Sequence, residues 1–365
     1  MALRCGIVGL PNVGKSTLFN SLSRAKAESA NYPFCTIDPN IGTITVPDER
    51  LYKIAELVKP EKVVPTTIEF VDIAGLVKGA SKGEGLGNQF LANIRETDAI
   101  IHILRCFDDD NVAHVDATVD PVRDKEVVDI ELQLKDLETI RNRMQKIDKQ
   151  SKLGDKEARK LMTLLEKHEH HLSQGKPVRD LNLTKEEKGM VRDLHLLTDK
   201  PVLYVCNVDE ASAIEGNRYV EQVKDAVAGE EAEVTVIAAS VEAEIAELET
   251  EEERQMFLED FGLKESGLNK LIHVAYRLLH LETFFTIGPK EVRAWTVKTG
   301  TPAPVAGGFI HSDFQRGFIK AEVIKYPDFI EHGSEVTCRE AGKIFLEGKD
   351  YIVKDGDIIT FKFNV

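Results

Sequence analysis

The twelve residues CGIVGLPNVGKS, numbered 5–16, decide the fold of this chain. The apolar run at 3–8 predicts a buried strand, and residues 17–22 open a helix. Between them, residues 9–16 fit the pattern G-x-x-x-x-G-K-[ST] in the strand–loop–helix context that a P-loop requires. The glycines let the backbone curl inward, and the helix start adds the positive end of its dipole. The stretch therefore predicts a phosphate-binding loop.

Two side chains of this loop have predicted chemical roles. Lys15 is expected to reach the β- and γ-phosphates of a nucleotide as a catalytic group, and the Ser16 hydroxyl to hold Mg²⁺. The predicted nucleotide-binding residues of the loop are Asn12, Val13, Gly14, Lys15, Ser16 and Thr17.

The composition indicates a globular chain of two to three domains. Its 365 residues are 42% hydrophobic, and they include neither a run long enough to span a membrane nor a signal-peptide pattern. The five cysteines are widely spaced and form no C-x-x-C pair, which is typical of reduced thiols. We therefore expect a cytoplasmic protein that does not bind membranes. The sequence does not determine its oligomeric state, and a monomer is the working assumption.

The net charge of −15 is concentrated in one part of the chain. Residues 201–281 carry 6 Lys and Arg against 18 Asp and Glu. This acidity argues against non-specific coating of nucleic acid. It leaves open an RNA contact by the nearly neutral middle and C-terminal segments.

Two segments are typical of nucleotide switches. Thr36, in an irregular segment bounded by prolines, is the candidate for a second Mg²⁺ contact that closes over the γ-phosphate, and an ordinary surface turn is the alternative. Residues 66–71 predict a strand that leads into Asp72-Ile73-Ala74-Gly75. In this D-x-x-G motif, Asp72 is expected to hold Mg²⁺ through water, and the N–H of Gly75 to sense the γ-phosphate.

The residue after Gly75 is Leu76, where Ras-like enzymes place a glutamine that orients the attacking water. An aliphatic side chain cannot do this, so hydrolysis requires another group or is slow. His114, in a polar loop, is the candidate because an imidazole can orient or deprotonate water near neutral pH. An exposed loop histidine without a role is an equally good reading. The neighbouring acidic run at 108–110 favours a solvated loop over a metal cage.

The pattern changes to a helical period from residue 124. Two charged helices separated by Leu153-Gly154-Asp155 predict an antiparallel hairpin, and Thr184 with Glu187 predicts a capping box that opens a further helix through Leu197. The histidines at 168, 170 and 171 favour a solvated helix face over a metal site. A projecting charged hairpin is typical of a partner-binding element.

The base-recognition motif departs from that of GTPases. The apolar run 201–207 predicts a strand that ends in Asn207-Val208-Asp209-Glu210, where GTPases have Asn-Lys-x-Asp. Val208 replaces the lysine that stacks on the base, and Glu210 replaces the aspartate that pairs with guanine. Loss of such a bidentate pair reduces specificity by orders of magnitude, so we expect guanine preference to be lost and Asn207 to meet an adenine edge. Ser240, after the next predicted strand, is expected to flank the base.

These features together resemble the YchF, or Obg-like, ATPase family along the whole chain. The resemblance rests on GLPNVGKS, Thr36, DIAGL with Leu76, NVDE in place of NKxD, the helical insertion and the C-terminal segment. It implies a translation-factor-class P-loop protein that prefers ATP, requires Mg²⁺, hydrolyses ATP slowly and binds the ribosome. In related enzymes that lack the catalytic glutamine, the residue matching Asn12 helps to hold K⁺, so potassium activation is a hypothesis here.

The C-terminal residues 282–365 alternate like short strands with turns and one helix, which predicts a β-grasp module. This segment resembles a TGS domain, and the resemblance implies RNA or ribosome contact through it. The hairpin is the other candidate for an RNA contact.

We therefore predict an α/β fold: a P-loop NTPase domain with a mostly parallel sheet, an inserted helical hairpin, and a C-terminal β-grasp domain. The predicted boundaries are 1–123 with 201–281, 124–200, and 282–365. Two other functions remain open: a GTP-operated switch of the Obg type, which Glu210 disfavours, and a metabolite phosphotransferase, which does not need the Thr36 and D-x-x-G pair.

Overall fold

The computed structural model describes residues 3–28, 41–73, 86–109 and 118–364. The chain folds into two compact units. The first comprises Met1–Ile44 and Glu69–Ala275, and the second comprises Thr45–Ile68 and Tyr276–Val365. No helix of the described residues is long and apolar enough to cross a membrane.

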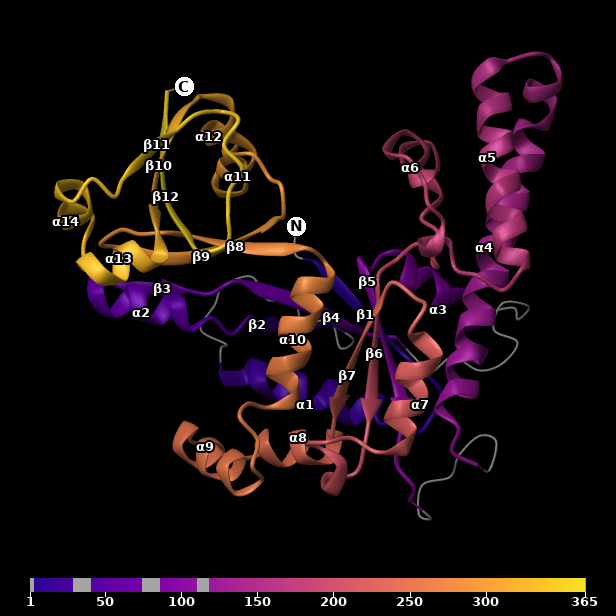
Figure 1. Ribbon diagram of the computed structural model, residues 1–365, viewed down its shortest axis with the longest axis horizontal. Coiled ribbons are helices and arrows are strands. Elements are labelled where there is room, and N and C mark those ends of the chain that lie inside the picture. The colour runs from indigo at the N-terminus through magenta and orange to yellow at the C-terminus, as the bar shows by residue number, and fades with distance from the viewer. Residues whose placement is uncertain (1–2, 29–40, 74–85, 110–117, 365) are drawn as a thin grey trace. The chain divides into compact units, whose positions relative to one another are not determined.

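The first unit is built on a six-stranded sheet in the order β2–β4–β1–β5–β6–β7 (Figure 1). In this sheet β1 pairs in parallel with β4 and β5, and β6 pairs in parallel with β5 and β7. The strands are β1 (Arg4–Val8), β2 (Ile41–Thr45), β4 (Thr67–Asp72), β5 (Ala99–Arg105), β6 (Val202–Asn207) and β7 (Ala232–Ile237). The helices are α1 (Lys15–Glu28), α3 (Leu86–Arg95), α4 (Pro121–Lys152), α5 (Lys156–Ser173), α6 (Lys185–Val191), α7 (Arg218–Val227), α8 (Ala239–Ile245), α9 (Glu251–Asp260), α10 (Gly267–Leu278) and the short η1 (Val178–Asp180), η2 (Arg192–Leu194) and η3 (Glu210–Ser212). The predicted P-loop fold with a mostly parallel sheet is confirmed.

The neighbouring strands β5 and β6 are buried along their whole length, as their nearly continuous apolar sequences require. His102 is a polar residue in the otherwise largely apolar strand β5, and it is buried like its neighbours. Burial lowers its pKa to about 3, so this imidazole is neutral within the sheet.

The strand order places the P-loop where open α/β sheets bind their ligands. β1 has β4 on one side and β5 on the other, so the order along the sheet reverses beside the loop that follows β1. Crevices of this kind lie outside the carboxyl ends of the parallel strands.

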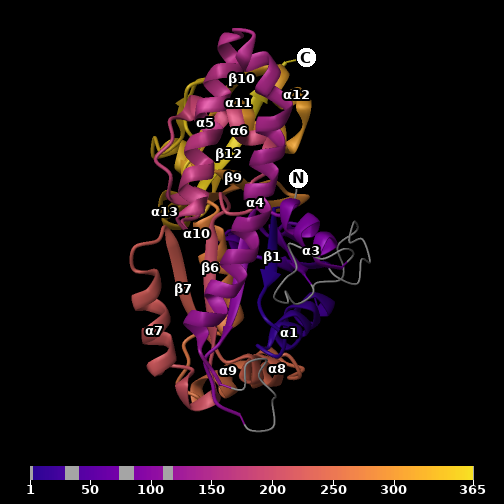
Figure 2. The same cartoon turned by 90° about the vertical axis from the view of Figure 1, so that its right-hand side faces the viewer.

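The predicted helical hairpin is confirmed, and α4 and α5 lie side by side in both views (Figures 1 and 2). α4 follows the N-cap Asp120 and has 32 residues, a length of about 48 Å at 1.5 Å per residue. The turn uses Gly154 at φ 99°, and Asp155 caps the start of α5. Apolar side chains from both helices form the hairpin core, among them Leu137, Ile140, Leu164 and Leu165.

The segment after α5 folds back onto this core, which corrects two predictions. His168 is fully buried rather than solvated, with its Nδ1 2.7 Å from the carbonyl oxygen of Leu164. The capping box of Thr184 and Glu187 is present, but α6 ends at Val191 and not at Leu197. A short η2 turn follows α6 and is capped by His195, whose φ of 45° is incompatible with a continued helix. The buried Asp136 carboxylate then accepts hydrogen bonds from the N–H groups of residues 197 and 198, both at 2.8 Å, and fixes the chain there.

The second unit contains a mixed six-stranded sheet in the order β11–β10–β12–β8–β9–β3. Its strands are β3 (Lys62–Val64), β8 (Leu281–Thr286), β9 (Glu291–Lys298), β10 (Phe318–Lys325), β11 (Phe345–Glu347) and β12 (Asp357–Phe363). Its helices are α2 (Glu49–Val58), α11 (Ala303–Ile310), α12 (Ser312–Arg316), α13 (Tyr326–His332) and α14 (Glu335–Glu340).

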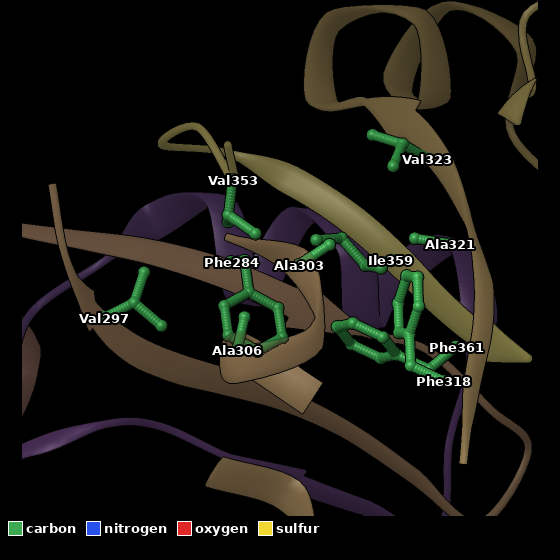
Figure 3. Close-up of a cluster of buried hydrophobic side chains, with 10 residues drawn as sticks. All are labelled: Phe284, Val297, Ala303, Ala306, Phe318, Ala321, Val323, Val353, Ile359 and Phe361. Carbon is green, nitrogen blue, oxygen red and sulfur yellow. The ribbon is translucent and has the colours of Figure 1, made fainter. Parts of the chain in front are cut away.

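Successive residues of this sheet enter two different hydrophobic cores. Phe284 and Ile359 belong to one core (Figure 3), whereas their chain neighbours Phe285 and Ile358 belong to the other. This is the alternation expected of strands covered on both faces. The sheet therefore buries apolar side chains on both sides.

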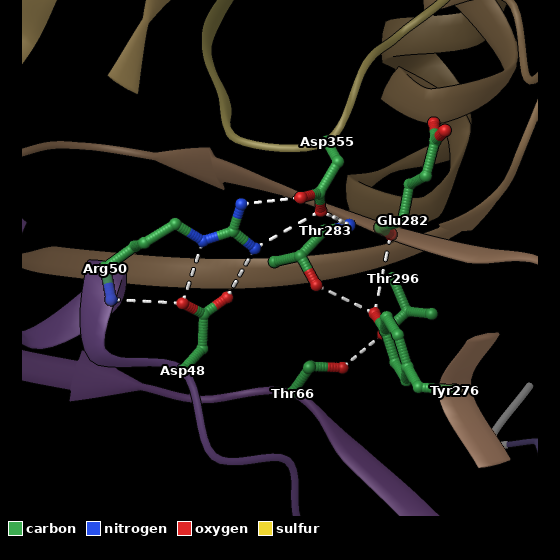
Figure 4. Close-up of polar contacts among 8 residues, drawn as sticks. All are labelled: Asp48, Arg50, Thr66, Tyr276, Glu282, Thr283, Thr296 and Asp355. Atoms are coloured by element: carbon green, nitrogen blue, oxygen red, sulfur yellow. Dashed lines mark hydrogen bonds and ion pairs between the residues drawn. The ribbon is translucent and has the colours of Figure 1, made fainter. Parts of the chain in front are cut away.

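Residues 45–68 pack with the second unit, although the predicted boundaries placed them in the nucleotide-binding domain. The reason is local: β3 extends the mixed sheet by pairing in parallel with β9, and Leu51 of α2 lies in the second core. Polar contacts add to this (Figure 4). Arg50 forms ion pairs with Asp48 at 2.8 Å and with Asp355 at 2.6 Å. The sequence holds no local signal for this long-range pairing.

Candidate nucleotide site

The loop after β1 has the backbone conformation that the sequence motif predicts. Gly9, Asn12 and Gly14 have positive φ angles of 154°, 62° and 95°. A Cβ atom on Gly9 would lie 2.5 Å from the carbonyl oxygen of Ile103, and one on Gly14 would lie 2.3 Å from Nδ2 of Asn207. Both glycines are therefore required by space as well as by conformation.

Lys15 is the first residue of α1, and its side chain is buried against the loop. Its Nζ donates hydrogen bonds to the carbonyl oxygens of Gly9 at 3.0 Å and Leu10 at 2.6 Å. Burial lowers the pKa of Lys15 to about 8, and the nearby Asp72 carboxylate partly offsets this. An ammonium group so placed is oriented along the loop, where phosphate oxygens can replace the two carbonyls.

Asp72 ends β4 on the same edge of the sheet. Burial raises the pKa of this carboxyl group, and Lys15 opposes the shift. Its Oδ1 atom is buried without a hydrogen-bond partner among the described residues. Such an oxygen is available to a cation or to water bound to one.

These residues fit Mg²⁺, which prefers oxygen ligands and usually retains several waters. Ser16, exposed on the first turn of α1, and Asp72 are the described side chains that would hold it. The described residues contain no cluster of three or more His, Cys, Asp or Glu suited to a metal. The arrangement therefore fits an Mg²⁺ ion that is bound partly by nucleotide phosphates, rather than one bound by protein side chains alone.

Asn207 joins the P-loop to the base end of the site. Its Nδ2 donates to the carbonyl oxygen of Val13, and its Oδ1 accepts from the N–H of Ala239, both at 2.9 Å. The side chain is 5% exposed. The Nδ2 and Oδ1 atoms that were expected to meet an adenine edge thus both have protein partners. The second hydrogen on Nδ2 is the group that could still bind an adenine. Adenine reading by Asn207 stays a prediction that depends on this hydrogen.

A pocket of about 480 Å³ lies at the carboxyl ends of the parallel strands. It is lined by Asn12, Gly14, Thr17, Phe107, Asp108, Asp109, Asn207, Val208, Asp209, Glu210, Ala239 and Ser240. The P-loop, the end of β6 and the start of α8 therefore meet here, as predicted. Lys15 and Ser16 are not among the lining residues, so the pocket extends from the phosphate loop toward the base.

The altered base motif has a mixed chemistry. Val208 is 2% exposed, and its N–H donates to the carbonyl oxygen of Ile237 at 2.9 Å. Asp209 caps η3 by accepting from the N–H of Ser212. The Glu210 side chain is exposed at the pocket and forms no hydrogen bond or ion pair with any other residue that the structure describes. The carboxylate next to the base position is therefore free to meet solvent or ligand, and the stacking lysine of GTPases is absent.

Sequence reasoning missed the loop after β5 as a wall of this pocket. Phe107, Asp108 and Asp109 line it, and the ring of Phe107 is half-buried. The available signal was topological, because β5 lies between β1 and β6 and its carboxyl end must reach the same crevice.

Three predicted site residues lie outside the described residues. These are Thr36, Gly75 and His114. Their roles remain predictions.

The phosphate loop, its buried lysine and the carboxylate at the end of β4 define a P-loop NTPase. The chain is 55% identical over 367 residues to the ribosome-binding ATPase YchF of Bacillus subtilis, which covers 100% of both chains. It is 54% identical over 365 residues to the protein of the same name from Escherichia coli O157:H7, again over 100% of both. The chain belongs to the YchF family.

Family models and a solved structure agree with this assignment. A model described as a 50S ribosome-binding GTPase matches residues 4–167, and the YchF GTPase C-terminal model, described as a protein of unknown function (DUF933), matches residues 281–364. The YchF GTPase of Schizosaccharomyces pombe has a similar structure, with a TM-score of 0.89 and 37% identity, covering 99% of this chain and 97% of that one.

Proposed function

We propose that this chain is an Mg²⁺-dependent ATPase of the cytoplasm that binds ATP in preference to GTP and associates with the ribosome. The observation that carries the proposal is a P-loop site with an intact phosphate end and a base end that lacks the stacking lysine and the guanine-reading aspartate. The relatives from Bacillus subtilis and Escherichia coli are named ribosome-binding ATPases, which supports both parts.

Hydrolysis would proceed by in-line attack of water on the γ-phosphate. Lys15 exchanges its bonds to the carbonyls of Gly9 and Leu10 for bonds to phosphate oxygens and so stabilises the developing charge. Bound Mg²⁺ supplies further charge neutralisation, and Ser16, Thr36 and Asp72 are the residues that we assign to hold it. The charge of Asp72 partly offsets the effect of burial on the pKa of Lys15 and so favours the protonated ammonium.

The attacking water has no glutamine to orient it, since Leu76 follows Gly75. We assign this task to the backbone of Gly75, to His114, to K⁺ held with the help of Asn12, or to the ribosome. Slow hydrolysis in the absence of a partner follows from this assignment.

The hairpin and the C-terminal unit are the proposed partner-binding elements. We keep residues 124–200 as the insertion and assign RNA contacts to it and to the TGS-like segment. The protein is proposed to act as a monomer.

The test is ATP hydrolysis by the purified protein with Mg²⁺ present, with GTP as competitor and with and without 70S ribosomes. The proposal expects slow release of phosphate from ATP, weak competition by GTP, and cosedimentation with ribosomes. The solved relative is described as a GTPase, so preferential hydrolysis of GTP would instead support a GTP-operated switch.

Potassium activation is tested in the same assay. Equal rates in Na⁺ and K⁺ would remove the role assigned to Asn12.

A further inference from the structure

Arg105 is a charged side chain inside the core of the first unit. It is the last residue of β5, and it is 2% exposed. Because a guanidinium group does not lose its charge in proteins, its burial requires close hydrogen-bond partners.

Those partners include the backbone of the loop that follows the strand. Nε of Arg105 donates to the carbonyl oxygen of Phe107 at 3.2 Å, and Nη2 donates to the carbonyl oxygen of Asp109 at 3.1 Å. The guanidinium carbon also lies 4.7 Å from the centre of the Phe107 ring. One side chain thus holds two carbonyls and covers one face of an aromatic ring.

The start and middle of the loop are fixed by other elements. The N–H of Cys106 donates to the carbonyl oxygen of Asn207 at 2.8 Å, and Nδ2 of Asn217 donates to the carbonyl oxygen of Cys106 at 2.7 Å. The hydroxyl of Tyr219 donates to Asp108 at 2.8 Å. Arg105 adds the hydrogen bonds to the carbonyl oxygens of Phe107 and Asp109, on either side of Asp108, and all three residues line the pocket.

The loop residues Phe107, Asp108 and Asp109 line the pocket, whereas Arg105 does not. Arg105 therefore lies behind the wall that a nucleobase or ribose would contact. Lysine cannot replace it, since a single ammonium on a flexible stem lacks the planar fork that reaches two carbonyls while stacking on a ring.

We propose that Arg105 is a positioning residue for the base end of the nucleotide site. It sets the conformation of residues 107–109 and so raises the affinity for the nucleoside part of ATP without touching the nucleotide. The inference rests on the proposed binding of ATP in this pocket. Its consequence is selective: contacts to the triphosphate, made by the P-loop, do not depend on Arg105.

The experiment compares ATP with inorganic tripolyphosphate, which presents the phosphates alone. Both are titrated calorimetrically, with Mg²⁺, into wild type and Arg105→Lys. We expect the ATP dissociation constant to rise about tenfold, the scale of one or two charge-assisted hydrogen bonds. The tripolyphosphate constant should stay within about twofold, a difference too small to reflect the loss of a hydrogen bond.

The matched control is Arg179→Lys. Arg179 is also nearly buried in the first unit, but its Nη2 pairs with Glu230 at 3.2 Å and it does not line this pocket. This control should leave both constants unchanged. An Arg105→Lys protein that binds ATP like wild type, or that loses ATP and tripolyphosphate equally, overturns the proposal.

A second variant covers the case in which Arg105→Lys does not fold. Phe107→Leu keeps apolar bulk but removes the ring that Arg105 covers, and it should weaken ATP while leaving tripolyphosphate unchanged. If Phe107→Leu binds ATP like wild type, the loop does not support the base and the role of Arg105 is refuted. A wild-type protein that binds tripolyphosphate but not ATP would reject the proposed function itself.

Discussion

The phosphate end and the base end of the nucleotide site differ in how far they follow the pattern of P-loop GTPases. At the phosphate end, the sequence matches the motif at every required position, and the structure shows why few other residues fit. Gly14, at φ 95°, has no room for a Cβ beside Asn207. At the base end, Val208 and Glu210 depart from the GTPase motif, and the pocket accommodates both.

The difference shows which part of such a site is free to change. Phosphate is bound by curled backbone and one lysine, so each substitution disturbs the fold of the loop as well as its ligand. The base is contacted by side chains at the ends of strands, which can change without altering the strands. Nucleotide preference can therefore change while the phosphate chemistry is kept.

Removing the lysine should have the largest effect. Lys15→Ala eliminates the cation that contacts the phosphates, and we expect ATP and tripolyphosphate affinity to fall by about 100-fold or more, as for other preorganised charged contacts. Calorimetry with both ligands measures this. If Lys15→Ala kept tripolyphosphate affinity but lost ATP affinity, the two ends would be assigned the wrong way round.

Asn207 lies between the phosphate end and the base end, and its removal should affect both protein stability and nucleotide binding. Asn207→Ala removes the bonds to Val13 and Ala239. It leaves buried backbone groups unpaired at a cost of about 1–3 kcal/mol each. We expect a lower melting temperature and about tenfold weaker binding of both ATP and tripolyphosphate, a loss of the size that one such bond implies. A variant whose tripolyphosphate affinity and melting temperature were both unchanged would show that Asn207 does not support the P-loop.

A substitution at Ser16 tests the proposed Mg²⁺ contact at the phosphate end. Ser16→Ala removes an oxygen ligand that we assign to Mg²⁺, so the Mg²⁺ concentration for half-maximal hydrolysis should rise about tenfold, as expected for the loss of one ligand hydroxyl. Ser151→Ala, on the hairpin, is the control. An unchanged Mg²⁺ requirement would contradict the assignment, and chelation of Mg²⁺ by EDTA should stop hydrolysis in every variant.

A variant remote from both ends should leave nucleotide binding unchanged. Asp136→Asn, in α4, replaces an acceptor of the Thr198 N–H with an amide donor. We expect a loss of stability of about 1–3 kcal/mol with no change in the ratio of ATP to tripolyphosphate affinity. A changed ratio of ATP to tripolyphosphate affinity would mean that the helical insertion influences binding at the base end.

The same variant carries a pH prediction. Burial raises the pKa of Asp136 from 3.8 to about 6, so the folded protein binds this proton more readily than the unfolded chain does. Its contribution to stability is therefore present at low pH and is lost as the pH rises through about 6. The melting temperature of wild type relative to Asp136→Asn should fall between pH 4 and 6. A constant difference would show that the carboxyl group is not perturbed.

Much of the fold could be predicted because its signals are local. The P-loop motif, the apolar runs of the central strands and the break at Gly154 lie within short windows, and the structure follows each of them. The packing of residues 45–68 with the C-terminal sheet could not be predicted, because β3 is three residues long and pairs with β9 far along the chain. The burial of His168 was missed for a similar reason, since the segment that covers the hairpin core comes later in the sequence.

The candidate site divides in the same way. Lys15 and Ser16 lie where their motif predicts, and Asp72 lies where the strand before it ends. Phe107 and Arg105 belong to no motif, because their role arises from the position of β5 in the sheet. Asn207 was recognised, but its two bonds within the protein depend on the loop of another strand and are invisible in the sequence.

The central claim is that the base end prefers ATP, and the most direct test is calorimetric titration of ATP and GTP, with Mg²⁺, into wild type and the Val208→Lys, Glu210→Asp double variant. We predict that wild type prefers ATP by about tenfold or more, which corresponds to about 1.4 kcal/mol, and that the double variant shifts toward GTP. A wild-type preference for GTP would contradict the account and would indicate that the protein is a GTP-operated switch.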